Sequence, residues 1–166
     1  MATLERELRR KLEHTVRLAR KTAEAGAQKA IHRLGVGEPE PPSGLNLAAQ
    51  SLRLRLRAHG HQLGDRRDRR GTQSIERLTS ECAYEHWHRM LFARFLAENE
   101  CLIEPESGVA ISLAECQELA RQRNENWLTL ASGFAQRMLP EIFRKDDLVL
   151  DLSLPPETRG AWNLLS

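Results

Sequence analysis

The chain is poor in cysteine and in aromatic residues, and it contains no long hydrophobic run. Its 166 residues include three cysteines, three tryptophans, four phenylalanines and one tyrosine. Three cysteines without paired spacing exclude a disulfide framework and a cysteine-rich zinc site. No segment approaches the roughly 18 apolar residues that span a bilayer, and the charged N-terminus lacks the apolar core of a secretory signal. We therefore expect a cytoplasmic protein with no membrane partner.

The motifs of common catalytic and cofactor sites are also missing. The sequence has no P-loop, no glycine-rich methyl-donor loop and no Asn-Pro-Pro-aromatic tetrapeptide. Gly35-Val-Gly37 follows a predicted helix, whereas a phosphate-binding loop follows a strand. His86 and His88 point about 200° apart on a helix, so they do not readily share one metal ion. We accordingly assign no catalytic, cofactor-binding or metal-ligating residue.

Charge is distributed unevenly along the chain although the net charge is only +2. Residues 1–75 hold 16 Lys/Arg and 8 Asp/Glu, a net charge of +8, and residues 76–166 carry a net charge of −6. A basic N-terminal half faces either a polyanion or an acidic surface, and the acidic half of the same chain is one such surface.

Hydrophobic periodicity predicts a mainly α-helical fold. A first long helix over 3–34 has a narrow apolar stripe that becomes rich in alanine, and Gly35 ends it. The stripe consists of Leu4, Leu8, Leu12, Val16, Ala19, Ala23, Ala27 and Ile31. Residues 38–44 contain three prolines within four positions, which predicts a stiff linker. The boundaries are therefore an arm at 1–37, the linker at 38–44 and a helical domain at 45–166.

The helical domain is expected to be a compact bundle of about five helices. Asn46 caps a helix that runs to about His59, although the Leu/Arg alternation at 52–57 is also compatible with a strand. A loop at 60–71 precedes a central helix from Thr72 to about Asn99. Its apolar face comprises Ile75, Leu78, Cys82, Ala83, Trp87, Met90, Leu91 and Phe95.

The rest of the sequence, after about Asn99, predicts three shorter helices and at most a small β-hairpin near 102–111. Ser112 and Glu115 form a capping box, and Asn124 or Asn126 caps the next helix. Pro155-Pro156 begins the last helix.

Seven arginines are concentrated within the 18 residues 53–70, against only two aspartates. Six of them form the candidate cluster, namely Arg53, Arg57, Arg66, Arg67, Arg69 and Arg70. Arginine stays charged and directs paired donors onto phosphate oxygens, so this cluster is a candidate nucleic-acid contact. The alternative is a solvated face with local Asp–Arg pairs. No aromatic residue lies among the arginines, which argues against base stacking on a single strand.

The predicted central helix carries a family resemblance. Its segment 81–99 resembles the N-terminal helical domain of large adenine-specific DNA methyltransferases of phage-defence (BREX- and DISARM-type) and fused type II restriction–methylation systems. The matching positions are Ala83, Tyr84, Trp87, Arg89, Ala93, Arg94, Phe95 and Asn99. Residues 103–107 and 139–143 also resemble the segments that come next in the chains of that family. The resemblance covers about residues 70–166.

This resemblance implies a non-catalytic part of an enzyme that transfers a methyl group from S-adenosylmethionine to adenine N6. The donor loop and the catalytic tetrapeptide of the family lie in a later domain, so the enzymatic character of this chain stays open. The implied partners are double-stranded DNA, the remainder of the methyltransferase and other defence-system subunits. The alternative function is a protein-interaction module that associates, with itself or with a partner, through the 3–34 helix.

Overall fold

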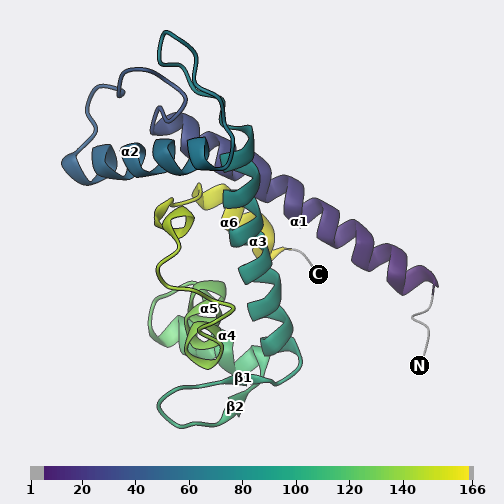
Figure 1. The fold of residues 1–166 in the computed structure, drawn as a ribbon. Helices are drawn as coiled ribbons and strands as arrows, with labels where there is room; N and C mark the ends of the chain where they lie inside the picture. The colour runs from purple at the N-terminus through teal and green to yellow at the C-terminus, as the bar shows by residue number, and fades with distance from the viewer. Residues whose placement is uncertain (1–5, 165–166) are drawn as a thin grey trace. The chain divides into compact units, whose positions relative to one another are not determined.

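The computed structural model describes residues 6–164, and Leu4 of the predicted stripe lies outside this range. The fold is mainly α, as predicted from the sequence (Figure 1). Its helices and strands are α1 (Arg6–Arg33), α2 (Leu47–Gln62), α3 (Glu76–Glu98), β1 (Leu102–Ile103), β2 (Ala110–Ile111), α4 (Leu113–Gln122), α5 (Trp127–Met138), the 3₁₀-helix η1 (Leu148–Asp151) and α6 (Pro156–Asn163). No helix among the described residues is both long enough and apolar enough to cross a membrane.

The chain forms two compact units. The first unit comprises the chain up to His86 together with the segment from Leu148 onward, and the second comprises Trp87–Asp147. This division differs from the predicted one, which separated an arm and a linker from one helical domain. The difference arises because the C-terminal segment returns to the first helix, and periodicity along the sequence cannot show such a long-range contact.

The second half of α1 belongs to the core of the first unit. Its buried face consists of small residues and one isoleucine, namely Ala19, Ala23, Gly26, Ala27, Ala30 and Ile31. The indole Nε1 of Trp162 in α6 donates to the carbonyl oxygen of Ala19 at 3.3 Å. Gly35 has a φ of 62° and ends the helix as predicted, with Val36 N donating to Ile31 O in a Schellman pattern.

The proline-rich segment 38–44, predicted as a stiff linker, is hydrogen-bonded to the rest of the first unit at its start. The carbonyl oxygen of Gly37 accepts from Gln73 N at 2.8 Å, and that of Glu38 accepts from Arg53 Nη2 at 2.6 Å. Prolines cannot donate backbone hydrogen bonds, but their carbonyl oxygens and those of their neighbours remain available as acceptors. Donors from α2 and from the loop before α3 therefore fix this segment to the first unit.

Helix α2 forms where the sequence left a strand as an alternative. The side chain of Asn46 accepts from Ala49 N at 2.8 Å, which confirms the predicted cap. Helix α3 starts at Glu76 instead of the predicted Thr72. Gln73 is held in an isolated antiparallel bridge with Arg67, and this pairing keeps residues 72–75 outside the helix.

The second unit packs α4, α5 and the short hairpin against the end of α3. Its buried core includes Ala93, Leu96, Ala97, Leu102, Cys116, Leu130, Ala131, Phe134 and Phe143. The capping box of Ser112 and Glu115 and the cap by Asn126 are confirmed. Phe95 differs from its predicted core position, since it is 55% exposed and stacks on Phe92. Arg94 pairs with Glu98 at 2.6 Å, one turn away in α3.

Candidate nucleic-acid interface

The six arginines of the predicted contact fall into two sets with different surroundings. Arg53 and Arg57 in α2 are only 4% and 7% exposed. The other four lie in the loop between α2 and α3 and are exposed, namely Arg66, Arg67, Arg69 and Arg70. The structure therefore brings the sequence cluster together but leaves only the loop arginines accessible to a ligand.

Arg53 and Arg57 direct their donors onto backbone carbonyl oxygens. Arg53 Nε donates to Gly35 O at 3.0 Å, and its Nη2 donates to the carbonyl oxygens of Glu38 and Pro39. Because these donors are occupied inside the unit, the two side chains act as structural clamps. This role differs from the predicted phosphate contact.

Arg57 connects more segments of the chain than Arg53 does. Its Nη1 donates to the carbonyl oxygens of Val36 and Glu38, and its Nη2 donates to Gly71 O at 2.7 Å. Burial lowers the pKa of Arg57 from its ordinary value, and the nearby positive charges lower this pKa further, while Glu38 raises it. The side chain stays cationic at neutral pH because an arginine pKa starts far above 7.

Asp65 fixes the start of the arginine-bearing loop. Its side chain is buried, and its carboxylate accepts from the backbone nitrogens of Arg77 and Leu78 at 3.0 Å each. These nitrogens belong to the first turn of α3, where backbone N–H groups have no intrahelical partner. A residue outside the helix therefore supplies the cap of α3, and the loop cannot shift without exposing that helix end.

The middle of the loop is closed by Asp68 and Gln73. Asp68 Oδ1 accepts from the backbone nitrogens of Arg70 and Thr72 at 2.8 and 2.9 Å. Gln73 is 3% exposed, accepts from the guanidinium of Arg67 and donates to Arg57 O at 2.9 Å. Both aspartates thus accept from backbone N–H groups, and the local Asp–Arg ion pairs of the predicted alternative are not formed among the described residues.

The guanidinium groups of the loop arginines form no ion pair with a carboxylate of the described residues. No carboxylate of residues 6–164 lies within 4.0 Å of the guanidinium nitrogens of Arg66, Arg67, Arg69 or Arg70. Additional exposed cations lie on the first half of α1, namely Arg6, Arg9, Arg10, Lys11, Arg17, Arg20 and Lys21. This arrangement attracts an anionic ligand, and guanidinium groups suit phosphate oxygens in particular.

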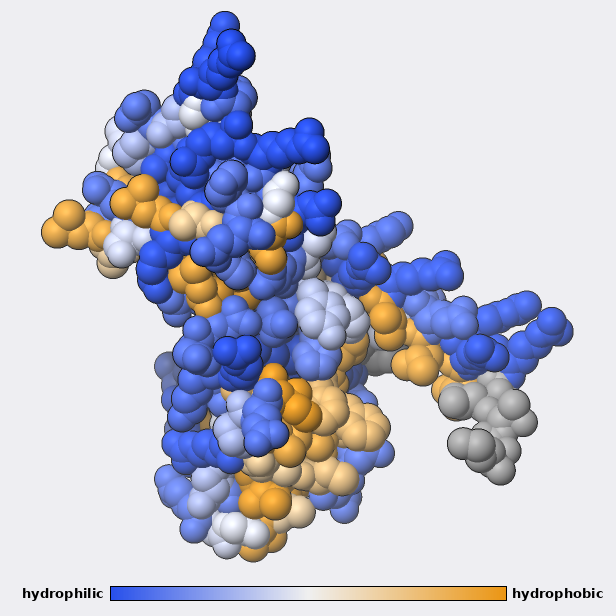
Figure 2. Space-filling view, viewed as in Figure 1, coloured by the Kyte–Doolittle hydropathy of each residue, from blue (hydrophilic) through white to orange (hydrophobic). Residues whose placement is uncertain are grey.

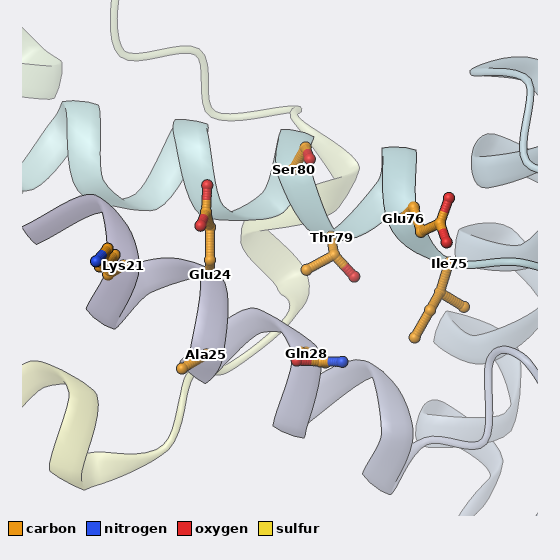
Figure 3. A pocket seen from close by; sticks show the side chains of 8 residues that line it. All are labelled: Lys21, Glu24, Ala25, Gln28, Ile75, Glu76, Thr79 and Ser80. Atoms are coloured by element: carbon orange, nitrogen blue, oxygen red, sulfur yellow. The ribbon is translucent and has the colours of Figure 1, made fainter. Parts of the chain in front are cut away.

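A groove of ≈ 470 Å³ lies between α1 and the start of α3 in the same unit. Figure 3 shows the side chains that line the groove, with Lys21, Glu24, Ala25 and Gln28 of α1 on one side and Ile75, Glu76, Thr79 and Ser80 on the other. The lining mixes both charge signs, which favours no single ligand class. Nearby, His59 Nε2 lies 3.0 Å from Glu81 Oε1, an ion pair when the imidazole is protonated.

The described residues hold no group of three or more His, Cys, Asp or Glu side chains suited to a metal ion. Sequence reasoning missed Asp65 and Gln73, which hold the loop in place. The sequence around these two residues shows no helical or strand periodicity. Their hydrogen-bond partners include Arg57, Arg77 and Leu78, which lie in other segments of the chain. No family model, no curated protein and no solved structure matches the chain.

Proposed function

We propose that this chain is a non-catalytic module that contacts the DNA backbone and acts as a scaffold within an adenine-specific (N6) DNA methyltransferase. The enzyme would belong to a cytoplasmic restriction–modification or phage-defence system, as the resemblance of segment 81–99 implies. S-adenosylmethionine and the catalytic groups would be bound by another part of that enzyme. The chain itself contributes binding.

One observation carries the proposal: four exposed arginines lie on a loop whose backbone is fixed at both ends. Asp65 anchors the loop to α3, and Arg57 anchors Gly71 to α2. A fixed loop loses little conformational entropy when it binds, so its cations contribute more to affinity than those of a disordered segment. Contacts to phosphate carry no sequence information, which suits a supporting role.

The proposed contact also fits the demands of base methylation in a duplex. An enzyme that modifies a base must turn it out of the stack, at a cost of a few kcal/mol. Contacts to the flanking phosphates hold the duplex while this happens. A basic module beside the catalytic domain supplies such contacts. Their affinity comes from the release of counterions from the DNA and does not depend on the DNA sequence.

The test is duplex binding by the intact chain, measured by fluorescence anisotropy at several salt concentrations between about 50 and 200 mM. Neutralising Arg66, Arg69 and Arg70 to glutamine should weaken binding to unrelated duplexes equally. The slope of log K against log salt should become shallower by about 2 to 3 units, because each lost phosphate contact accounts for about 0.9.

A matched control removes three exposed arginines from the second unit, Arg121, Arg137 and Arg144, again to glutamine. Both triple variants lower the net charge equally. The proposal requires that the loop variant lose clearly more affinity than the control. Equal losses would show nonspecific attraction to overall charge, and unchanged binding in the loop variant would remove the loop from the interface.

A further inference from the structure

Helix α1 has one continuous apolar face that is covered over only half of its length. The stripe runs from Leu8 and Leu12 through Val16 to Ala19 and onward to Ala30 along one side of the helix. From Ala19 to Ile31 its apolar residues are buried in the first unit. Before Ala19, Val16 on the same face is half-buried, and Leu8 and Leu12 are exposed.

Helix α6 covers part of the second half and stops where the open part begins. A Cβ placed on Gly26 would meet Thr158 Oγ1 at 2.4 Å, so the two helices touch closely there. Trp162 lies four residues after Thr158 in α6, and its indole N–H donates to the carbonyl oxygen of Ala19. Ala19 lies seven residues before Gly26 in α1. The two helices therefore run in opposite directions, and α6 ends at Asn163.

The open half presents leucine side chains. Leu8 and Leu12 on this face are 54% and 55% exposed. Figure 2 shows hydrophobic side chains along this part of α1, set between hydrophilic ones. Burying apolar side chains is favourable, so a helix that covered this face would be stabilised by contact with it. Leu164, directly after α6, is 82% exposed as well.

The charges around the open half determine which helix would fit. Residues 6–21 carry seven Lys/Arg side chains and only two Glu, and one of these, Glu13, already pairs with Arg9 at 3.5 Å. A second copy of α1 would bring two such positive surfaces together, and like charges in contact disfavour association. An acidic helix would instead gain complementary pairs along both edges of the stripe.

We propose that the open half of α1 is a docking surface for an acidic amphipathic helix of a partner protein. The helix lies along Leu8 and Leu12, antiparallel to α1 and end to end with α6, and its carboxylates face the lysine and arginine side chains. This surface is separate from the arginine-bearing loop, so the inference does not depend on DNA binding.

The experiment measures the binding of a fluorescent three-heptad peptide to the full chain by anisotropy. The peptide carries leucine at heptad positions a and d and glutamate at e and g. A second peptide keeps the leucines and replaces each glutamate by lysine. We expect saturable binding of the acidic peptide, at least about tenfold weaker binding of the lysine peptide, and a decrease of the acidic binding with added salt.

Variants of the chain locate the contact. The double variant Leu8→Gln, Leu12→Gln should bind the acidic peptide with an affinity that is lower by about tenfold or more. The matched control changes two exposed leucines of α2, Leu47 and Leu54, to glutamine and should leave binding unchanged. All four positions are exposed helical sites, so the fold is expected to persist, which far-UV circular dichroism checks.

Four results would overturn the inference. They are no binding of the acidic peptide, equal loss in both double variants, a chain dimer in sedimentation that the Leu8/Leu12 variant abolishes, and adsorption to phosphatidylglycerol vesicles through these leucines without peptide binding. Loss of DNA binding in the loop variant leaves this inference untouched, so the two proposals fail separately.

Discussion

Arg57 Nη2 donates a hydrogen bond to the carbonyl oxygen of Gly71 at 2.7 Å, which ties α2 to the end of the arginine-bearing loop. The same guanidinium also donates to the carbonyl oxygens of Val36 and Glu38. One buried cation therefore connects three segments that are far apart in the sequence. The stability of the first unit and the shape of the exposed loop therefore both depend in part on this side chain.

We predict that Arg57→Gln lowers the free energy of unfolding by about 2–4 kcal/mol, because it removes one buried hydrogen bond, to Val36 O, and two partly buried ones, to Glu38 O and Gly71 O. Arg57→Lys should cost a similar amount, since a single ammonium cannot reproduce a planar fork of donors. Urea titration followed by circular dichroism measures both values.

The control for this prediction is Arg55→Gln in the same helix. Arg55 pairs with Asp151 at 3.2 Å, and both side chains are 52% exposed. Such surface ion pairs contribute about 0–1 kcal/mol, so this variant should remain close to the wild type. Equal destabilisation by the Arg55 and Arg57 substitutions would contradict the clamp role of Arg57.

The close approach of α1 and α6 at Gly26 gives a second prediction. A methyl group at Gly26 would lie 2.4 Å from Thr158 Oγ1 and 2.8 Å from its Cγ2. We expect Gly26→Ala to destabilise the chain by about 1–3 kcal/mol through overpacking. Adding Thr158→Ala should recover a large part of this loss, because it removes both of the clashing atoms.

Gly160→Ala in α6 serves as the comparison, since a Cβ there meets nothing within 4 Å. Alanine favours a helix over glycine by about 0.5–1 kcal/mol, so this substitution should stabilise the chain slightly. The packing explanation would be refuted if Gly26→Ala also stabilised the chain, or if Thr158→Ala failed to relieve its cost.

Much of this fold could be predicted because its helix signals are local. The cap by Asn46 and the capping box of Ser112 and Glu115 depend on residues within three positions of each other. The narrow stripe of α1 follows from the helical period of about 3.6 residues. These features need no knowledge of distant segments, and the structure confirms them.

The candidate site was harder to predict because its contacts are long-range. Helical spacing showed that Arg53 and Arg57 share a face, but it did not show that residues 35–39 fold over that face. Asp65 caps a helix that begins eleven positions later, which no local cap pattern describes. The loop arginines were found from composition alone, since exposed charge requires no specific packing partner.

A third prediction concerns the distant cap of α3. Asp65→Ala removes the acceptor of Arg77 N and Leu78 N, and we expect a loss of about 1–3 kcal/mol. Asp65→Asn keeps one acceptor oxygen and should cost less. The comparison is Asp146→Ala, an exposed residue whose ion pair with Arg144 is 3.7 Å long, which should change the unfolding free energy by less than about 0.5 kcal/mol.

The unfolding free energies of these three variants, measured under one condition, decide whether the cap is essential. If Asp65→Ala unfolded at the same urea concentration as Asp146→Ala, the backbone nitrogens of α3 would be equally well satisfied by water. The loop would then not be anchored by Asp65. Hydrogen exchange at Arg77 and Leu78 gives an independent measure, and it should accelerate in the alanine variant.

The last prediction concerns the cysteines and pH. Burial raises the pKa of the Cys116 thiol from 9.0 to about 11. The folded state thus binds this proton more tightly than the unfolded state does. The resulting stabilisation is fully present below the unfolded pKa near 9 and disappears as the pH rises through the folded pKa near 11.

We therefore expect the wild type to lose more unfolding free energy than Cys116→Ala as the pH rises from about 8 to about 11. Lysine and tyrosine side chains also titrate in this range, but they are identical in the two proteins and cancel in the comparison. Parallel pH profiles of the two proteins would contradict the raised pKa of Cys116.

The two cysteines should also differ in their reaction with a thiol reagent at pH 8. The exposed Cys101 should react in the native protein. The buried Cys116 should react only after denaturation, because its thiolate is absent at this pH and its sulfur is inaccessible.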